Sequence, residues 1–190
     1  GHVTGVQTCP LPILMFQTAG DCRSYVEPVV TWIEQLIQAD QCVLAGNTTA
    51  TSCSNSPMTG SLASELKTLP SVEQTVGIRY GRPDFNGTVV YLIAIDAEAY
   101  ATATRSRSPT GMPDLERFRD LPGTNNALVS HNFAVRHNVQ VGQTIELPGP
   151  RGPVPLTVIG TVRDYSWSRG TVFLDRARYA ALFDDDLIDI

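Results

Sequence analysis

The chain has 190 residues, of which 42% are hydrophobic and 17% are charged, and its formal net charge is −5. This composition excludes a disordered protein, and the length allows a real hydrophobic core in one large domain or two small ones. The arginines are scattered and Lys67 is the single lysine, so the basic surface of a nucleic-acid-binding protein is missing and no nucleic-acid partner is expected.

No stretch of 18 apolar residues is present in the sequence. No basic segment followed by an apolar core and a small-residue cleavage site is found either. The sequence therefore predicts neither a membrane span nor a signal peptide within these residues.

Residues 1–13 (GHVTGVQTCPLPI) show neither helical nor strand periodicity, because Pro10 and Pro12 interrupt both. Two interpretations stay open. The segment is non-native, similar to translated sequencing-adapter read-through, or it is an extended or disordered lead-in. In either case it is left out of the fold prediction.

Cysteines stand at positions 9, 22, 42 and 53, without a C-x-x-C pair. With histidine also scarce, this pattern does not predict a zinc site, and we expect no metal and no cofactor. A disulfide between Cys42 and Cys53 would close a loop rich in Thr, Ser and Asn, and it is the preferred bridge for an oxidising compartment. Four free thiols are the alternative.

Periodicity in the first half predicts helices alternating with strands. Apolar residues recur at helical spacing and predict a helix over 26–39. A β-branched run predicts the strongest strand over 88–95, and Asn86–Gly87 predicts the tight turn before it. The other expected elements are a strand at 41–45, a loop at 46–60, a helix at 61–69, a strand at 71–80 and a helix at 97–104 capped by Asp96.

Residues 105–123 form a linker by composition, rich in Arg, Ser, Pro and Gly, with a small amphipathic segment at 114–121. The arginines of this stretch suggest a solvated surface rather than a site for an acidic partner.

The second half predicts a β-rich unit. Ser130 is placed to cap a helix over 131–138, Asp175 to cap a last helix over 177–183, and Gly160 to mark a bulge inside a strand. The expected strands are 127–129, 143–147, 154–162 and 171–174, with a hairpin loop at 148–153 and the start of a further strand, without its partner, at 187–190.

The sequence lacks a P-loop, a G-x-S-x-G elbow and an H-E-x-x-H pair. Two weaker constellations exist. Ser130 and His131 with Asp164 resemble a hydrolase triad, and a helix cap with a surface histidine is the alternative. Asp184–Asp186 with Asp189 offer oxygen ligands for Ca²⁺, and a solvated acidic turn is the alternative. In both cases we favour the alternative, and we predict no catalytic residues and no enzyme.

Tyr165 and Trp167 lie on an expected exposed turn between two strands. Exposed aromatic side chains often anchor a partner protein, so these two residues are the candidate partner contact. The other interpretation is that they cap the core of the β-rich unit, and both stay open.

The order of these elements resembles the extracytoplasmic (periplasmic core) domain of FtsX/MacB-like ABC transporter permeases. The first half offers a loose match. Its matching residues are Leu69, Pro70, Val72, Ala94, Ile95, Asp96 and Tyr100. The second half matches more specifically, at Leu128, Val129, Ser130, Ala134, Val141, Gly142, Ile145, Leu147, Val158, Gly160, Val162, Asp175, Tyr179 and Phe183.

The resemblance implies an α+β fold of the MacB-like periplasmic core type. It assigns residues 14–104 to a porter-like α/β sub-region, 105–123 to a linker, 124–183 to a smaller β-rich sub-region, and 184–190 to the start of a truncated return strand. Two rigid lobes joined by the linker would suit a hinge.

As the resemblance implies, the function would be to couple ATP-driven motion to transport or to a partner outside the membrane. The location would be the extracytoplasmic side of the bacterial cell membrane, as part of an integral membrane protein. The expected partners are an ABC ATPase, reached through membrane helices outside this chain, a second permease copy and a periplasmic protein. The alternative is a secreted or periplasmic binding module without a transporter.

Overall fold

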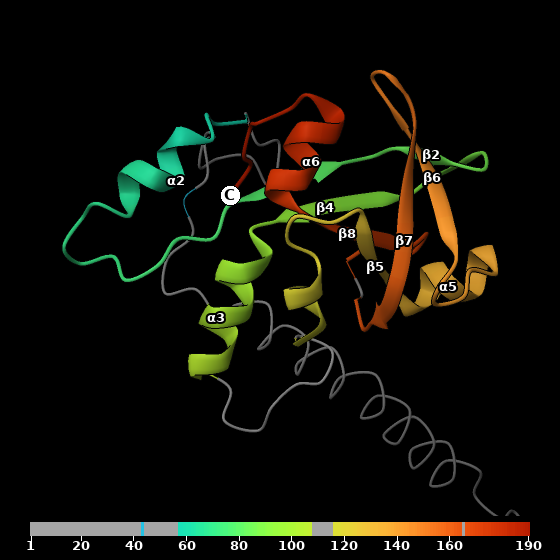
Figure 1. Cartoon of the computed structure of the whole chain (residues 1–190), viewed down its shortest axis with the longest axis horizontal. Coiled ribbons are helices and arrows are strands. Elements are labelled where there is room, and N and C mark those ends of the chain that lie inside the picture. Colours follow the sequence, from blue (N-terminus) through green and yellow to red (C-terminus); the bar gives the residue numbers. More distant parts are fainter. Residues whose placement is uncertain (1–42, 44–56, 108–115, 165) are drawn as a thin grey trace, which may run out of the picture. The chain divides into compact units, whose positions relative to one another are not determined.

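The computed structural model describes residues 43, 57–107, 116–164 and 166–190 (Figure 1). The helix predicted over 26–39 and three candidate site residues, Cys42, Cys53 and Tyr165, lie outside the described residues. The disulfide therefore stays a prediction.

The described part of the chain contains both helices and runs of consecutive strands. In chain order they are α2 Ser61–Leu66, β1 Ile78–Gly81, β2 Asp84–Phe85, β3 Thr88–Val89, β4 Tyr91–Ile95, α3 Ala97–Arg107, η1 Arg117–Asp120, β5 Asn126–Ser130, α5 His131–His137, β6 Thr144–Gly149, β7 Gly152–Val162, β8 Thr171–Asp175 and α6 Arg176–Phe183.

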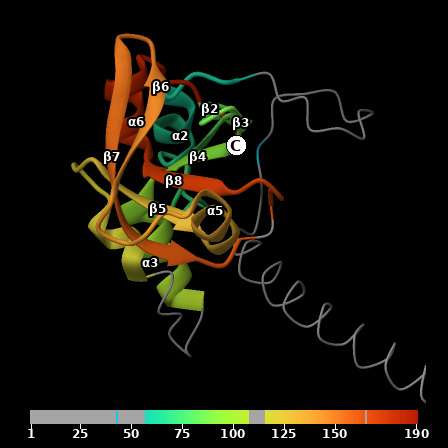
Figure 2. The same cartoon turned by 90° about the vertical axis from the view of Figure 1, so that its right-hand side faces the viewer.

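A mixed six-stranded sheet in the order β1-β4-β8-β5-β7-β6 forms the frame of the domain (Figures 1 and 2). β4 and β8 are parallel, with Tyr91 opposite Thr171 and Ile95 opposite Asp175. β8 is antiparallel to β5, and β5 is parallel to β7. β1 and β6 close the two edges, each antiparallel to its neighbour. A late strand, β8, thus lies at the centre of the sheet.

This topology contradicts the hinge between two separate lobes. β4 belongs to the first predicted sub-region and β8 to the second, yet the two strands pair over five residues. A rotation at 105–123 that separated the sub-regions would break these backbone hydrogen bonds. The sequence did not show this pairing because strand partners far apart in a chain leave no local signal. The sub-region boundaries themselves stay a prediction.

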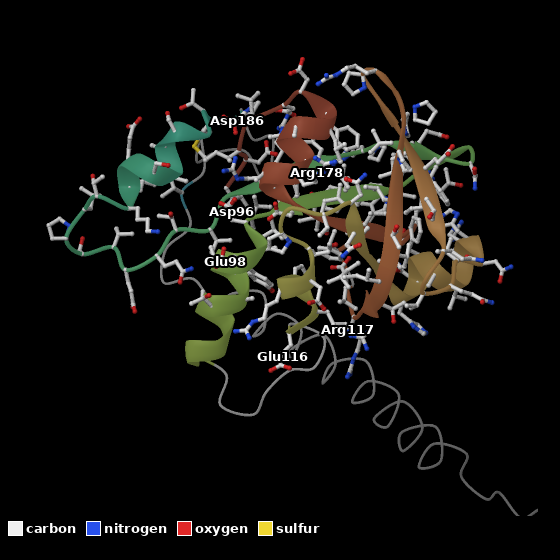
Figure 3. The ribbon with its side chains drawn as sticks, viewed as in Figure 1. Asp96, Glu98, Glu116, Arg117, Arg178 and Asp186 are labelled. Carbon is white, nitrogen blue, oxygen red and sulfur yellow. The ribbon has the colours of Figure 1, made fainter. Side chains whose placement is uncertain are left out.

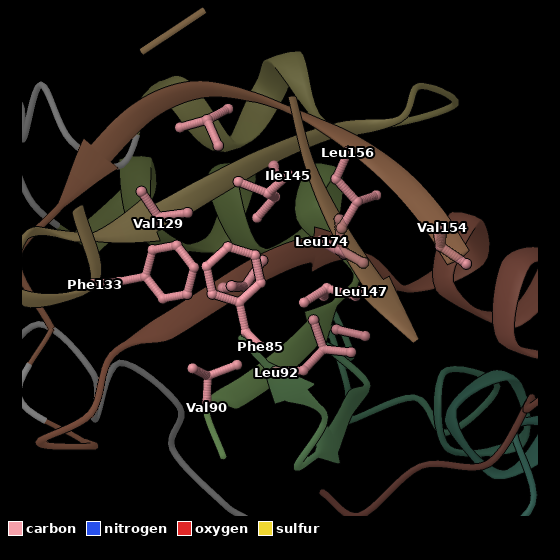
Figure 4. Packing of buried hydrophobic residues seen from close by; sticks show 14 of the residues in the cluster. Phe85, Val90, Leu92, Val129, Phe133, Ile145, Leu147, Val154, Leu156 and Leu174 are labelled. Atoms are coloured by element: carbon pink, nitrogen blue, oxygen red, sulfur yellow. The ribbon is translucent and has the colours of Figure 1, made fainter. Parts of the chain in front are cut away.

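Each face of the sheet carries its own apolar core. On one face, Phe133 of α5 packs with Phe85 of the β2–β3 hairpin and with strand side chains such as Leu92 and Leu174 (Figure 4). Tyr179 of α6 belongs to the same core. The other core gathers residues of α3, η1 and the strands, including Ala97, Ala101, Phe118, Leu121, Ile93 and Phe173. Burial on both faces holds the central strands β4, β8 and β5 firmly in place.

Several local predictions are confirmed. The side chains of Ser130 and Asp175 accept hydrogen bonds from N–H groups in the first turns of α5 and α6. The β5–β7 register shifts between Ala127 and Leu128, so that Leu128 faces Gly160 and the predicted bulge is present. Asn86 and Gly87, at φ 51° and 76°, form the tight turn between β2 and β3.

Two predicted strands are shorter than expected. β1 begins only at Ile78, because the preceding residues Gln74 and Thr75 bond through their side chains to Ala99 and Ala63 of α3 and α2. The run at 88–95 breaks at Val90, whose N–H bonds to the Pro83 carbonyl and separates β3 from β4. In both places tertiary contacts override the local strand pattern.

Candidate functional site

The C-terminal segment 184–190 runs back along β1 and finds its partners within this chain. Ile188 forms a bridge with Met58. The N–H of Ile78 donates to the Ile190 carbonyl at 2.8 Å, and the N–H of Asp189 donates to the Ile78 carbonyl at 2.7 Å. The expectation that this strand lacks a partner here was therefore wrong, because β1 and residue 58 supply one.

Two arginines fasten this segment, and we call the arrangement the C-terminal clasp: Arg79, Arg176, Asp96, Asp185, Asp186 and Asp189. Arg79 of β1 places Nε 2.9 Å from Asp185 Oδ2 and Nη1 3.0 Å from Asp189 Oδ1. Asp189, which is buried, also accepts the Tyr80 N–H at 2.7 Å. Both carboxylates are therefore fixed against the edge strand.

The second arginine of the clasp, Arg176, is the first residue of α6. Its Nε lies 2.8 Å from Asp96 Oδ1, and its Nη1 lies 3.2 Å from Asp186 Oδ1. Asp96, predicted to cap α3, instead directs its carboxylate at Arg176 and at the Gly77 N–H, 2.8 Å away. Figure 3 shows Asp96 and Asp186 approaching α6 from different elements. The clasp thus joins the end of β4, the start of α6 and the C-terminal segment.

Burial and charge change the acidity of two groups at the clasp. Burial, followed by the negative charge of Asp185, raises the pKa of Tyr179 to about 12. The Tyr179 hydroxyl donates to Asp185 at 3.2 Å. Burial alone would lower the pKa of Arg79, but its bonds to Asp185 and Asp189 outweigh that effect and the pKa is raised. Both groups keep their protonated forms in neutral solution.

The clasp also engages the carboxylates of the acidic cluster that the sequence offered as oxygen ligands. Asp185, Asp186 and Asp189 are ion-paired to arginines, so their oxygens are already engaged by cationic side chains. Within the described ranges, no group of three or more His, Cys, Asp or Glu side chains is arranged to hold a metal ion.

At the other end of β4, the rings of Tyr80, Tyr91 and Trp167 stack in a row, and the Arg82 guanidinium lies over Trp167. We call these four residues the aromatic corner. The Tyr91 ring stacks on Trp167 with centroids 5.7 Å apart and on Tyr80 with centroids 5.3 Å apart. The Arg82 guanidinium carbon lies 5.3 Å from the Trp167 ring centroid. Trp167 is half-buried and Arg82 is exposed. Trp167 therefore both packs on the sheet and reaches the surface.

A buried polar network beneath the corner involves the residues of the hydrolase alternative. Ser130 is fully buried, and its hydroxyl accepts the N–H groups of Phe133 at 3.3 Å and Thr171 at 2.8 Å. The Asp164 carboxylate accepts hydrogen bonds from the hydroxyls of Ser166 and Thr171. Ser130 and Asp164 thus serve to fix the turn before β8, which is a structural role. His131 is exposed at the start of α5.

Sequence reasoning did not identify the clasp arginines, nor Arg82 and Tyr91 of the aromatic corner. One signal was available for Arg79, which stands between the apolar Ile78 and Tyr80 in a strand and therefore points to the opposite face. A charged residue at such a position needs a partner on that face. Its partners lie more than a hundred positions away, and no local pattern reveals them.

Helices in the described part of the chain all fall short of the length and hydropathy that a bilayer crossing requires. A family model described as the MacB-like periplasmic core domain matches residues 29–188. No curated protein sequence matches the chain.

Two solved structures are similar to the chain. The periplasmic region of MacB from Actinobacillus actinomycetemcomitans has 10% identity and a TM-score of 0.51, covering 77% of this chain and 69% of that one. The extracellular domain of the noncanonic ABC-type transporter YknZ from Gram-positive bacteria has 15% identity and a TM-score of 0.48, covering 70% of each chain. With the family match, the likeness to the MacB region confirms the expected α+β fold.

Proposed function

The chain belongs to the family of MacB-like periplasmic core domains, and we propose that it couples the ATP-driven motion of a transporter to an event outside the membrane. The match to the family over residues 29–188 is the observation that carries this proposal. Transport, or the activation of a partner protein, would be that event.

The clasp supports a mechanical role. The resemblance to permeases implies that membrane helices flank a domain of this kind. Arg79 and Arg176 fasten the C-terminal segment to β1 and α6, which belong to a frame packed on both faces. A displacement of this segment would therefore move the sheet as a unit, because packed interiors transmit strain instead of absorbing it.

The partners follow from the same proposal. An ABC ATPase acts from the cytoplasmic side through membrane helices, a second permease copy completes the transporter, and a periplasmic protein receives the motion. The domain lies on the extracytoplasmic side of the bacterial cell membrane as part of an integral membrane protein.

A distance measurement between two copies of the full-length protein tests this function without knowledge of the cargo. A spin-labelled unnatural amino acid replaces Val141, which is 58% exposed in the turn before β6, and leaves the four cysteines in place. The full-length permease is reconstituted with its ATPase in nanodiscs, and the label-to-label distance is measured by pulsed EPR with and without trapped ATP.

Coupling predicts a shift of several ångströms in this distance when ATP binds, as in other rigid-body domain movements. The same label beside an ATPase whose P-loop lysine is replaced should show no shift, which provides the control. An unchanged distance with the functional ATPase contradicts the proposed function. A full-length gene product without any membrane segment would instead favour the secreted binding module.

A further inference from the structure

The aromatic corner has the composition of an energetically important contact surface. Trp, Tyr and Arg are the residues that dominate binding energy at protein interfaces. Here the Trp167 ring centroid lies 5.3 Å from the Arg82 guanidinium carbon and 5.7 Å from the Tyr91 ring centroid. Val89, whose carbonyl lies next to the Trp167 indole nitrogen, is 37% exposed.

The surface is held in one conformation from several sides. Trp167 Nε1 donates to the Val89 carbonyl at 3.3 Å, and Asn132 Nδ2 donates to the Trp167 carbonyl at 2.8 Å. Gly170 packs so closely on α5 that a Cβ there would lie 2.6 Å from Phe133 Cβ. A preorganised turn loses little conformational entropy when a partner binds, so its contacts contribute more of their energy to affinity.

Charge distinguishes this end of the domain from the rest of the chain. The three segments that meet here, 81–90, 131–138 and 163–170, contain four arginines and two aspartates, although the whole chain has a net charge of −5. Of the aspartates, Asp164 is buried and Asp84 is exposed, whereas all four arginines are exposed. The exposed charge is therefore mainly positive, and it complements a negatively charged partner.

On β4 and β8, the Tyr91–Trp167 part of the corner and the Asp96–Arg176 pair of the clasp lie at opposite ends, whereas on β1 Tyr80 stands next to Arg79 and donates its N–H to Asp189. Tyr91 begins β4 and Thr171 begins β8, whereas Asp96 and Arg176 directly follow the other ends of these strands. If the ends of β4 and β8 that carry Asp96 and Arg176 face the membrane helices, Trp167 at the starts of these strands faces away from the bilayer. This step rests on the proposed function, and it favours a protein over anionic lipid headgroups.

We propose that the aromatic corner is a docking surface for an acidic segment of a partner protein outside the membrane. Acidic side chains of that segment pair with Arg82, Arg136 and Arg169, and an apolar side chain lies against Trp167 and Val89. Trp167, which the sequence left between partner contact and core cap, thus serves both purposes.

A site-specific cross-link tests the proposal in the native membrane. A photoreactive benzoylphenylalanine replaces Val89 in the full-length protein, and mass spectrometry maps the segment that it captures. That segment is then synthesised as a labelled peptide, and its affinity for the purified full-length protein is measured by fluorescence anisotropy at low and high salt.

We expect a captured segment rich in Asp and Glu, whose peptide binds more weakly as salt rises. Arg82→Glu and Trp167→Ala should each weaken binding about tenfold or more. Arg151→Glu makes the same charge change on the exposed β6–β7 hairpin and should leave binding unchanged. Because Arg82 is exposed, its variant separates loss of binding from loss of folding, which a melting curve checks for both variants.

Several results would overturn the docking surface. They are an adduct with phospholipid alone, no adduct at position 89, a captured segment without acidic excess, or equal affinities for Arg82→Glu and Arg151→Glu. The spin-label distance at position 141 separates this inference from the proposed function. An ATP-dependent shift without docking rejects only the docking surface, and docking without a shift rejects only the coupling.

Discussion

Replacing Arg79 with methionine tests whether the clasp holds the C-terminal segment as the structure indicates. Methionine keeps the unbranched apolar part of the side chain but removes both charge-assisted contacts, at 2.9 Å to Asp185 and 3.0 Å to Asp189. The Arg79 and Asp189 side chains are only 18% and 7% exposed, so the change leaves a largely buried carboxylate without its cation.

The magnitude follows from what each carboxylate retains. Breaking a buried ion pair from one side costs about 3–5 kcal/mol. Here Asp189 keeps the Tyr80 N–H, and Asp185, 21% exposed, can turn toward water. We therefore expect a loss of about 2–3 kcal/mol in the free energy of unfolding. For a chain of this length, that corresponds to a fall in melting temperature of about 5–10 °C.

Thermal and urea unfolding followed by circular dichroism measure this loss. A double-mutant cycle with Asp189→Asn separates the pair from its surroundings, and the double variant should lose at least about 1 kcal/mol less than the two single losses together. Arg151→Met is the matched control, because Arg151 is exposed on the β6–β7 hairpin. Its guanidinium makes only a 3.4 Å contact to the Ala181 carbonyl of α6. The substitution should cost less than about 0.5 kcal/mol.

Two outcomes would refute the reasoning behind the clasp. The first is a loss for Arg79→Met no larger than that for Arg151→Met. The second is strict additivity in the cycle with Asp189→Asn, which would mean that the two groups do not stabilise each other.

Gly170→Ala should cost about 3 kcal/mol or more in urea unfolding, because its φ of 104° disfavours a side chain and the new Cβ would overlap α5. Gly142→Ala, at φ 92° with open space around it, should cost only about 1 kcal/mol, and equal losses would contradict the close packing. The pKa of Tyr179 rises from 10.0 to about 12 on folding, so the stability that this group contributes is complete below pH 10 and is lost between pH 10 and 12. Tyr179→Phe should flatten that decline, and ultraviolet titration checks the value. Ser130→Ala should destabilise the domain by about 2 kcal/mol, because it removes a helix cap and the acceptor of the Thr171 N–H, and a neutral result would contradict its structural role.

Local features were predictable from the sequence wherever a few neighbouring residues determine the backbone. Ser130 and Asp175 cap helices through N–H groups three residues away, and Asn86–Gly87 turns a hairpin by itself. Gly160 lies opposite Leu128 at the register shift between β5 and β7, where the sequence placed a bulge. In these cases the residues that form the sequence pattern are the same residues that form the cap or the turn.

The candidate sites were harder to predict because their parts are distant in sequence. Asp96 has the position of a helix cap, but Arg176, eighty residues later, engages its carboxylate. Trp167 was identified by its residue type. Arg82 and Val89, which complete its surroundings, follow β1 and end β3, about eighty residues earlier in the chain. Resemblance to a family supplied the fold class, and only tertiary structure shows which side chains meet.

The central position of β8 has a consequence for how this domain is made. β4 and β5 acquire their shared neighbour only after the chain has been synthesised as far as residue 175, since β8 lies between them. Contacts between such distant parts of a chain form slowly. Until the last strand arrives, the apolar side chains of the earlier strands therefore lack a partner that covers them, and such exposed apolar surface favours aggregation.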